Sequence, residues 1–298
     1  MPRQTQKLRL LDGALGTELE RRGHDLRDSL WSAHLLIDEP GAIAAVHRDY
    51  VLAGADILIT SSYQLSFAGT PAHSLDDATV REALTRSVTL AREAARGRNI
   101  TVAASIGPYG AARADGSEFT GIYDRNEDEL VAFHRERFRH LAASDADMLA
   151  VETLPSFAEA KALLRLLDQS PRAAWFSFAC RNASQIADGT AFADCVALVA
   201  SHTRVAAVGI NCTPPQFVAE LVTTASRITN KPVLAYPNSG ETWDATTRGW
   251  SGTAMPGSFV AAARRWRERG ASWIGGCCRT TPEHIRALRT AFASELRR

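Results

Sequence analysis

Short apolar segments alternate along the chain with longer segments of helical periodicity. Eight segments are almost continuously hydrophobic, which is typical of parallel strands that are covered on both faces. They are Leu8–Leu11, Ile57–Thr60, Thr101–Ser105, Met148–Val151, Ala174–Ala179, Val205–Ile210, Val233–Tyr236 and Ser272–Ile274. Helical patterns lie between them, among others over Asp77–Ala95, Asp128–Ala143 and Phe157–Leu167. About eight strand–helix pairs without a linker predict an α/β fold, a (β/α)8 TIM barrel that forms one domain over residues 1–298.

Residues at the predicted helix starts support these boundaries. Asn126 and Ser156 are each followed three residues later by a glutamate, which is the pattern of a capping box. Thr281 precedes a proline, which is favoured at the first position of a helix. We therefore expect helices to begin directly after these three residues.

Three connections that follow predicted strands are long: 61–74, 106–125 and 237–257. Such loops lie at the C-terminal face of a barrel, where barrel enzymes keep their active sites. Two of these loops carry Tyr109, Trp243 and Trp250. We expect the loops to act as lids; the alternative is that they are tolerated insertions.

Composition excludes several classes of protein. The 34 Lys and Arg residues nearly balance the 33 Asp and Glu residues, so the net charge of +1 offers no basic surface for nucleic acid or anionic lipid. No apolar run approaches the ~20 residues that a membrane-spanning helix needs. The first residues lack the apolar stretch of a secretory signal. We expect a cytoplasmic protein, monomeric, that binds neither nucleic acid nor a membrane.

The cysteines give the sharpest chemical signal. Their number is five, which is odd, and without an export signal it argues against disulfides. Cys212 follows the sixth predicted strand, and the adjacent pair Cys277 and Cys278 follows the eighth. Three thiolates in one cavity suit a soft cation such as Zn²⁺, and three ligands leave a fourth position open, as in a catalytic zinc site. The alternative is that they are inert buried thiols, the class to which we assign Cys180 and Cys195.

Other polar residues also follow predicted strands, whereas the eight histidines do not. We assign the histidines to packing or to the surface. The sequence contains no Ser/His/Asp arrangement, no Walker loop and no G-x-G-x-x-G motif. The strand-end residues with chemistry to offer are Asp12, Tyr63, Glu152, Asn211 and Asn238.

Motifs along nearly the whole chain resemble the homocysteine S-methyltransferase family, and within it the short, single-domain bacterial and plant enzymes. The motifs are Asp12-Gly13-Ala14, Thr60-Ser61-Ser62-Tyr63-Gln64, Gly107-Pro108-Tyr109-Gly110, Glu152-Thr153-Leu154-Pro155, Gly209-Ile210-Asn211-Cys212, Tyr236-Pro237-Asn238-Ser239-Gly240-Glu241 and Gly275-Gly276-Cys277-Cys278-Arg279-Thr280-Thr281-Pro282. The resemblance implies a zinc-dependent enzyme that moves a methyl group from a sulfonium donor to the thiol of homocysteine, giving methionine. The implied donor is S-methylmethionine, with S-adenosylmethionine as a second donor.

The resemblance also implies roles for single residues. Cys212, Cys277 and Cys278 match the zinc thiolates of the family. Glu152 matches the acid that holds the homocysteine amino group, and Asp12 matches an acid near it. The remaining matches are Tyr63, an interim zinc ligand, and Asn211 and Asn238, polar residues of the site wall. Two alternatives stay open: Asp12 could cap a helix, and Glu152 could pair with an arginine.

The expected chemistry needs few protein groups. A zinc ion with an open position converts a bound thiol to the nucleophilic thiolate. The sulfonium donor leaves as a neutral thioether, so no general acid is required. Aromatic side chains of the lids, Tyr109, Trp243 or Trp250, could contact the sulfonium through cation–π interactions, worth about 0.5–2 kcal/mol.

Different functions on the same barrel also stay open. The chain ends 20 residues after Cys278, so we expect none of the extra domains of cobalamin- or folate-dependent relatives. Betaine-using relatives carry a C-terminal arm that we do not expect here, although betaine stays an alternative donor. The chain could also be a metal-dependent aldolase or lyase, or a non-catalytic zinc- or thiol-binding barrel.

Overall fold

Eight parallel strands form a sheet that closes on itself in a computed structural model, which describes residues 6–26, 31–68, 75–244, 249–251 and 255–297. The strand order is β1-β10-β7-β6-β5-β4-β3-β2, and a parallel bridge between Leu11 and Ile57 joins the two outer strands. The strands are β1 Arg9–Leu10, β2 Ile57–Ile59, β3 Thr101–Ile106, β4 Met148–Leu154, β5 Ala174–Phe178, β6 Val205–Asn211, β7 Val233–Tyr236 and β10 Ala271–Ile274. The predicted TIM-like barrel is confirmed.

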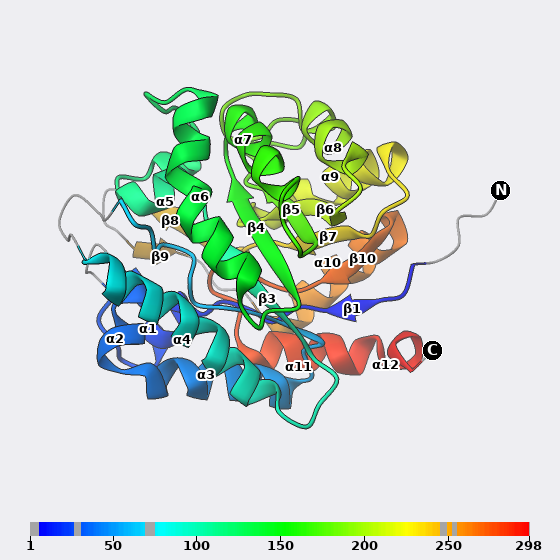
Figure 1. The fold of residues 1–298 in the computed structure, drawn as a ribbon. Helices are drawn as coiled ribbons and strands as arrows, with labels where there is room; N and C mark the ends of the chain where they lie inside the picture. Colours follow the sequence, from blue (N-terminus) through cyan, green and yellow to red (C-terminus); the bar gives the residue numbers. More distant parts are fainter. Residues whose placement is uncertain (1–5, 27–30, 69–74, 245–248, 252–254, 298) are drawn as a thin grey trace.

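Helices surround the barrel on its outside (Figure 1). The longer ones are α3 Pro40–Ala53, α4 Asp77–Ala95, α6 Glu127–Ala143, α7 Phe157–Leu167, α8 Phe192–Ser201, α9 Pro215–Ile228, α10 Pro256–Arg269 and α11 Pro282–Ala291. Shorter elements are α1 Gly16–Arg21, η1 Trp31–Ala33, α2 Leu35–Asp38, α5 Tyr109–Arg113, η2 Ser117–Phe119 and α12 Ala293–Leu296. The three predicted helices are present; α6 begins at Glu127, one residue before the periodic pattern and directly after Asn126, as its cap predicts.

Apolar side chains explain why these strands are continuous hydrophobic runs. One set fills the barrel interior, including Ala150, Trp175 and Leu234, while a larger set packs between the sheet and the helices. The interior is therefore a packed core rather than a pore. The apolar pattern predicts that β4 ends at Val151, but the strand continues to Leu154 and all seven of its residues are buried. The pattern stops short because polar residues are buried at this strand end.

The helices begin directly after all three predicted residues, but only two of the three predicted caps form. Asn126 and Glu129 form a full capping box at α6, and Thr281 caps α11. The predicted box at Ser156 is wrong, because its side chain makes no capping bond. The carboxylate of Asp188 accepts the Phe157 N–H there instead, at 2.8 Å. Glu159 is consequently free to turn its side chain into the protein.

The contribution of the α6 cap to the stability of the protein can be measured. Replacing Asn126 by alanine removes the bond to the Glu129 N–H, and we expect the free energy of unfolding to fall by about 1 kcal/mol. Urea denaturation measures this loss. Ser156→Ala is the matched control, because it removes no capping bond. If it lowered the free energy of unfolding as much as Asn126→Ala, the assignment of Asn126 as a stabilising cap would be wrong.

Two of the long loops contain structure of their own at the C-terminal end of the barrel. The connection after β7 includes an antiparallel hairpin, β8 Thr242–Asp244 with β9 Gly249–Ser251, and the connection after β3 includes α5 and η2. The hairpin and α5 lie at the same end of the barrel (Figure 1). Part of the third loop, 69–74, lies outside the described residues.

Of the three aromatic residues predicted to face the donor, the structure describes the side chain of only one, Tyr109. Tyr109 is buried and packs edge-on against Tyr123 and Phe133, while Arg113 lies over its ring. The structure therefore places Tyr109 in a packing cluster. The side chains of Trp243 and Trp250 lie outside what the structure describes, and their contact with a donor stays a prediction.

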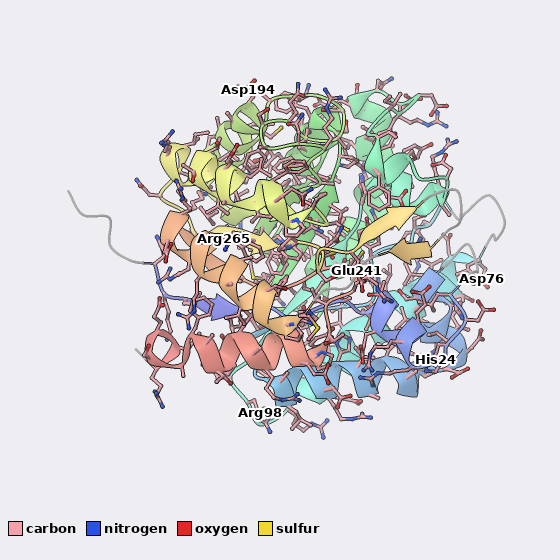
Figure 2. The ribbon with its side chains drawn as sticks, turned by 180° about the vertical axis from the view of Figure 1, so that it is seen from behind. His24, Asp76, Arg98, Asp194, Glu241 and Arg265 are labelled. Carbon is pink, nitrogen blue, oxygen red and sulfur yellow. The ribbon has the colours of Figure 1, made fainter. Side chains whose placement is uncertain are left out.

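Charged side chains of both signs cover the outside of the molecule. Asp194, Arg98 and Arg265 are exposed and project from different sides of it (Figure 2). This distribution agrees with the small net charge. Within the described ranges, no helix has both the length and the hydropathy required to cross a bilayer.

Candidate metal and substrate site

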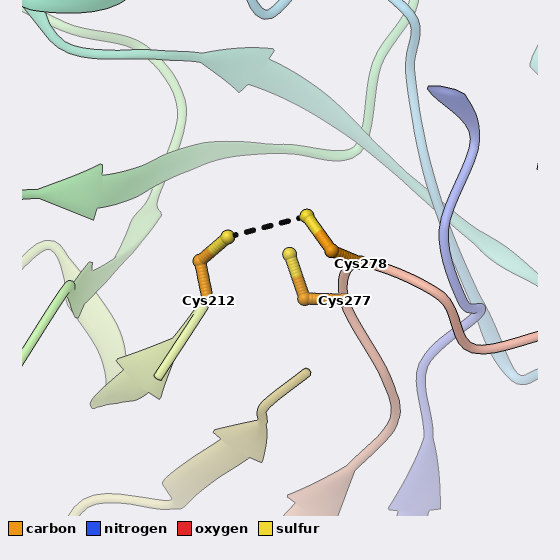
Figure 3. Close-up of side chains that lie close together, drawn as sticks. All are labelled: Cys212, Cys277 and Cys278. Carbon is orange, nitrogen blue, oxygen red and sulfur yellow. Dashed lines mark hydrogen bonds between the residues drawn. The ribbon is translucent and has the colours of Figure 1, made fainter. Parts of the chain in front are cut away.

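Three thiols from distant parts of the sequence meet at the C-terminal end of the barrel. Cys212 follows β6, and Cys277 and Cys278 follow β10 (Figure 3). The three sulfur atoms lie within 4.8 Å of one another, and Sγ of Cys212 is 3.5 Å from Sγ of Cys278. All three cysteines are free and partly buried. The predicted convergence of these residues is confirmed.

Unusual backbone conformations bring the thiols together. Cys212 has a φ of 49°, Thr153 a φ of 58° and Arg279 a φ of 66°. Side chains rarely adopt this left-handed region, and strain of this kind gathers at functional sites. Gly276 must lack a side chain, because a Cβ atom would lie 2.3 Å from the Thr280 hydroxyl. The turn that presents Cys277 and Cys278 is therefore tightly constrained.

The three thiols cannot all ionise without a cation. Hydrogen bonds from the other two thiols lower the pKa of Cys278. Interactions with the neighbouring sulfurs and burial raise the pKa of Cys212 well above its ordinary value. A soft divalent cation would remove this repulsion. Among the described residues, no histidine or carboxylate joins the group, so the donor set fits a zinc ion that keeps one position open.

Glu152 lies on β4 and is buried without a cationic partner. Its Oε1 accepts a hydrogen bond from the Ser105 hydroxyl at 2.5 Å, and its Oε2 accepts one from the Tyr236 hydroxyl at 3.1 Å. Burial raises the pKa of Glu152 to about 7. The alternative that Glu152 pairs with an arginine is wrong, because no described cation reaches its carboxylate.

Asp12, directly after β1, is the second buried acid of the site. Its Oδ2 accepts the Ile59 N–H at 2.9 Å, whereas its Oδ1 is buried with no hydrogen-bond partner. Burial raises the pKa of Asp12 well above its ordinary value, and the charge of Glu152 raises it further. Helix α1 begins at Gly16 without a side-chain cap, so the alternative that Asp12 caps a helix is wrong. Two buried carboxyl groups, one of which raises the pKa of the other, favour a cationic ligand.

The three remaining predicted residues also lie at this end of the barrel. The Asn211 amide is fully engaged: its oxygen accepts the Thr153 N–H and its nitrogen donates to the Thr153 hydroxyl, at 2.8 and 2.7 Å. Burial raises the pKa of the Tyr63 hydroxyl, and the charges of Glu118 and Cys212 raise it further. The Asn238 Oδ1 is buried and has no partner. Their contacts with substrate or metal stay predictions.

Sequence reasoning missed the residues that hold these groups in place. Ser105 and Tyr236 orient Glu152, and each occupied the last position of a predicted strand, a signal that could have identified them. Thr153 gave no such signal, because its positive φ cannot be read from the sequence. Cys180 and Cys195 are buried as predicted, and neither belongs to the sulfur group.

Comparison with known proteins places these features in context. Residues 9–292 match the family described as Homocysteine S-methyltransferase. The chain is 48% identical to Homocysteine S-methyltransferase YbgG of Bacillus subtilis, covering 98% of this chain and 96% of that protein. It is 41% identical to Selenocysteine Se-methyltransferase of Brassica oleracea, covering 98% of this chain and 91% of that one.

A solved structure has a similar fold over nearly the whole chain. The metallated form of the homocysteine methyltransferase MmuM of Escherichia coli superimposes with a TM-score of 0.84 at 42% identity, covering 96% of each chain. The chain therefore belongs to the homocysteine S-methyltransferase family.

Proposed function

We propose that this protein transfers a methyl group from a sulfonium donor to the thiol of homocysteine and so produces methionine. S-Methylmethionine is the proposed donor, with S-adenosylmethionine as a second one. Cys212, Cys277 and Cys278 would hold the zinc ion. The proposal is carried by one observation: three thiols, joined by no other metal-ligating side chain among the described residues, lie at the same end of the barrel as two buried acids that no described cation reaches.

Zinc, when bound, would lower the pKa of a coordinated thiol and so make it a nucleophile at neutral pH. The protein supplies the binding and the orientation. Glu152 and Asp12 provide negative charge for the ammonium group of homocysteine, and charge-assisted hydrogen bonds of this kind fix direction as well as affinity. Ser105 and Tyr236 keep the Glu152 carboxylate in place.

The reaction does not require an acid from the protein. The sulfonium sulfur gains the electron pair of the broken S–CH₃ bond and departs as a neutral thioether, while the new S–CH₃ bond forms on the acceptor sulfur. Positioning of donor and acceptor in line then supplies most of the rate enhancement. The site agrees with this, because none of the described histidines belongs to the sulfur group.

Bound metal and methyl transfer, measured together, test the proposal. We expect about one zinc ion per chain and formation of methionine from homocysteine and S-methylmethionine. S-Adenosylmethionine and betaine are tested separately as donors. Selenocysteine is tested as a second acceptor, since one relative is a selenocysteine Se-methyltransferase. Turnover that survives removal of the metal, or turnover with betaine alone, would contradict the proposal.

The titration of Glu152 predicts how activity depends on pH. Only the carboxylate form attracts an ammonium group, and the pKa of Glu152 is about 7, so binding of homocysteine should strengthen as pH rises through 7. The acceptor thiol also ionises with pH, so we compare wild type with Glu152→Gln. The kcat/KM of wild type for homocysteine, divided by that of Glu152→Gln, should rise about tenfold from pH 6 to pH 8. A ratio that does not change with pH would contradict this assignment.

The oligomeric state and the cellular compartment of the protein follow from the same features. We propose a monomer that acts in the cytoplasm, because the site is built from one chain and the surface carries balanced charge. Light scattering of the zinc-loaded protein tests the oligomeric state, and a dimeric mass would overturn that part.

A further inference from the structure

Three buried polar side chains form a hydrogen-bonded relay between α6 and α7. Its members are Arg137 and His134 of α6 and Glu159 of α7, and the side chains of all three are completely buried. The Arg137 guanidinium donates to the His134 Nδ1 at 2.8 Å. The His134 Nε2 lies 2.8 Å from the Glu159 Oε1. The relay thus joins a buried cation to a buried anion through an imidazole ring.

Hydrogen-bonding rules define the state of this imidazole. Arginine has no acceptor, so the Nδ1 of His134 must accept and its Nε2 must carry the proton that it donates to Glu159. Burial lowers the pKa of His134, which keeps the ring neutral at physiological pH. Burial lowers the pKa of Arg137 to about 10, so the guanidinium stays charged. The relay therefore has a single proton arrangement.

The relay holds two loops at the C-terminal end of the barrel. Arg137 donates to the backbone carbonyls of Leu65 at 2.9 Å, of Gly107 at 2.6 Å and of Tyr63 at 3.3 Å. At its other end, Glu159 accepts the Tyr109 N–H at 2.5 Å. One connected set of side chains consequently holds the loop after β2 and the turn after β3.

The two loops also interlock directly. A Cβ atom on Gly107 would lie 2.5 Å from the Tyr63 carbonyl oxygen and 2.7 Å from its ring. The Tyr63 ring thus packs against backbone that Arg137 holds, and Cys212 lies close enough for its charge to raise the pKa of the Tyr63 hydroxyl. Arg137 therefore holds the carbonyl of the same residue that packs against the Tyr63 ring.

We propose that Arg137, His134 and Glu159 are positioning residues that set the place of Tyr63 and of the turn over residues 107–109 for methyl transfer. They do not touch the reacting atoms. Buried ion pairs contribute little net stability compared with well-packed apolar residues, whereas the planar fork of arginine can bind several carbonyls in fixed directions. The catalytic part of this inference rests on the proposed function; the holding of the loops does not.

Arg137→Lys tests the inference, because lysine keeps the charge but loses the fork. The matched control is Arg289→Lys: Arg289 likewise binds a backbone carbonyl, that of Gly54, and a carboxylate, that of Asp56, at the opposite end of β2. We expect Arg137→Lys to lower kcat about 10- to 100-fold and to leave the KM for homocysteine within about twofold. Arg289→Lys should leave both unchanged.

A double-mutant cycle separates positioning from a general loss of structure. If the relay acts through Tyr63, Arg137→Lys should lower kcat less than about twofold in a Tyr63→Ala background. An equal loss in both backgrounds, or no loss in either, would overturn the inference. His134→Gln, which can still accept and donate, should keep more activity than His134→Leu. The opposite order would also count against the relay.

Hydrogen exchange gives a readout that needs no activity. In Arg137→Lys, backbone amides over 61–68 and 106–113 should exchange faster, while those of the other strands and helices keep their rates. Faster exchange throughout the barrel would show a merely structural role and overturn the inference. A wild-type protein without methyl transfer would instead refute the proposed function, and local exchange would still decide whether the relay holds the two loops.

Discussion

Cys278→Ser is expected to remove zinc from the protein and to lower methyl transfer by more than about 100-fold. Changes to groups that only support metal ligands cost about 10- to 100-fold, and loss of a ligand should cost more. Serine offers a hard, protonated oxygen in place of a soft thiolate. Hydrogen bonds from the other two thiols lower the pKa of Cys278, which favours the thiolate that a cation binds.

Elemental analysis and a methionine-formation assay measure the two effects together. Cys195→Ala is the matched control: it removes a free cysteine that is buried on α8 and lies outside the sulfur group. It should keep about one zinc ion per chain and wild-type kcat. A Cys278→Ser protein that retained zinc and turnover would refute the assignment of the three sulfurs as the metal site.

Glu152→Gln should raise the KM for homocysteine about 10- to 100-fold and change kcat much less. The substitution keeps the size of the side chain, and its amide can still accept from Ser105 and pair with Tyr236, which bond the carboxylate in the native protein. Only the charge is lost. A hydrogen bond to a charged group contributes about 1.5–3 kcal/mol, and each 1.4 kcal/mol corresponds to a factor of ten.

An acceptor without an amino group sharpens this test. 4-Mercaptobutanoate has the thiol and the carboxylate of homocysteine but no ammonium group, so wild type and Glu152→Gln should use it at equal rates. Glu220→Gln, an exposed site on α9, is the control for loss of a carboxylate elsewhere. Equal losses with both acceptors in Glu152→Gln would mean that Glu152 does not bind the amino group.

The sequence could predict which cysteines form the metal site because of one property of the barrel. Parallel strands in a closed sheet point their C-terminal ends the same way, so residues that follow different strands share one surface. Cys212 and Cys277 are 65 positions apart in the sequence, yet their sulfurs lie within 4.8 Å of each other. The order of the strands in the sequence was therefore sufficient to predict that these cysteines lie close together.

Local signals failed where a residue had a distant partner. Ser156 and Glu159 fit the pattern of a capping box, but Glu159 bonds to His134 and to the Tyr109 N–H instead. His134 fits the pattern of a packing residue, and it is one, but it is also the centre of a buried relay. A sequence pattern reports the nearest possible partner and cannot rank it against one from another helix.

Periodicity and strand order thus establish the barrel, its active end and the group of three sulfurs, since these depend on properties that repeat along the chain. The partners of each buried polar atom become known only in the folded protein. Glu152 takes its hydrogen bonds from residues 47 and 84 positions away, and Arg137 holds a carbonyl 72 positions away. Such pairings depend on strand register and on side-chain direction, which the alternation of apolar and polar residues does not encode.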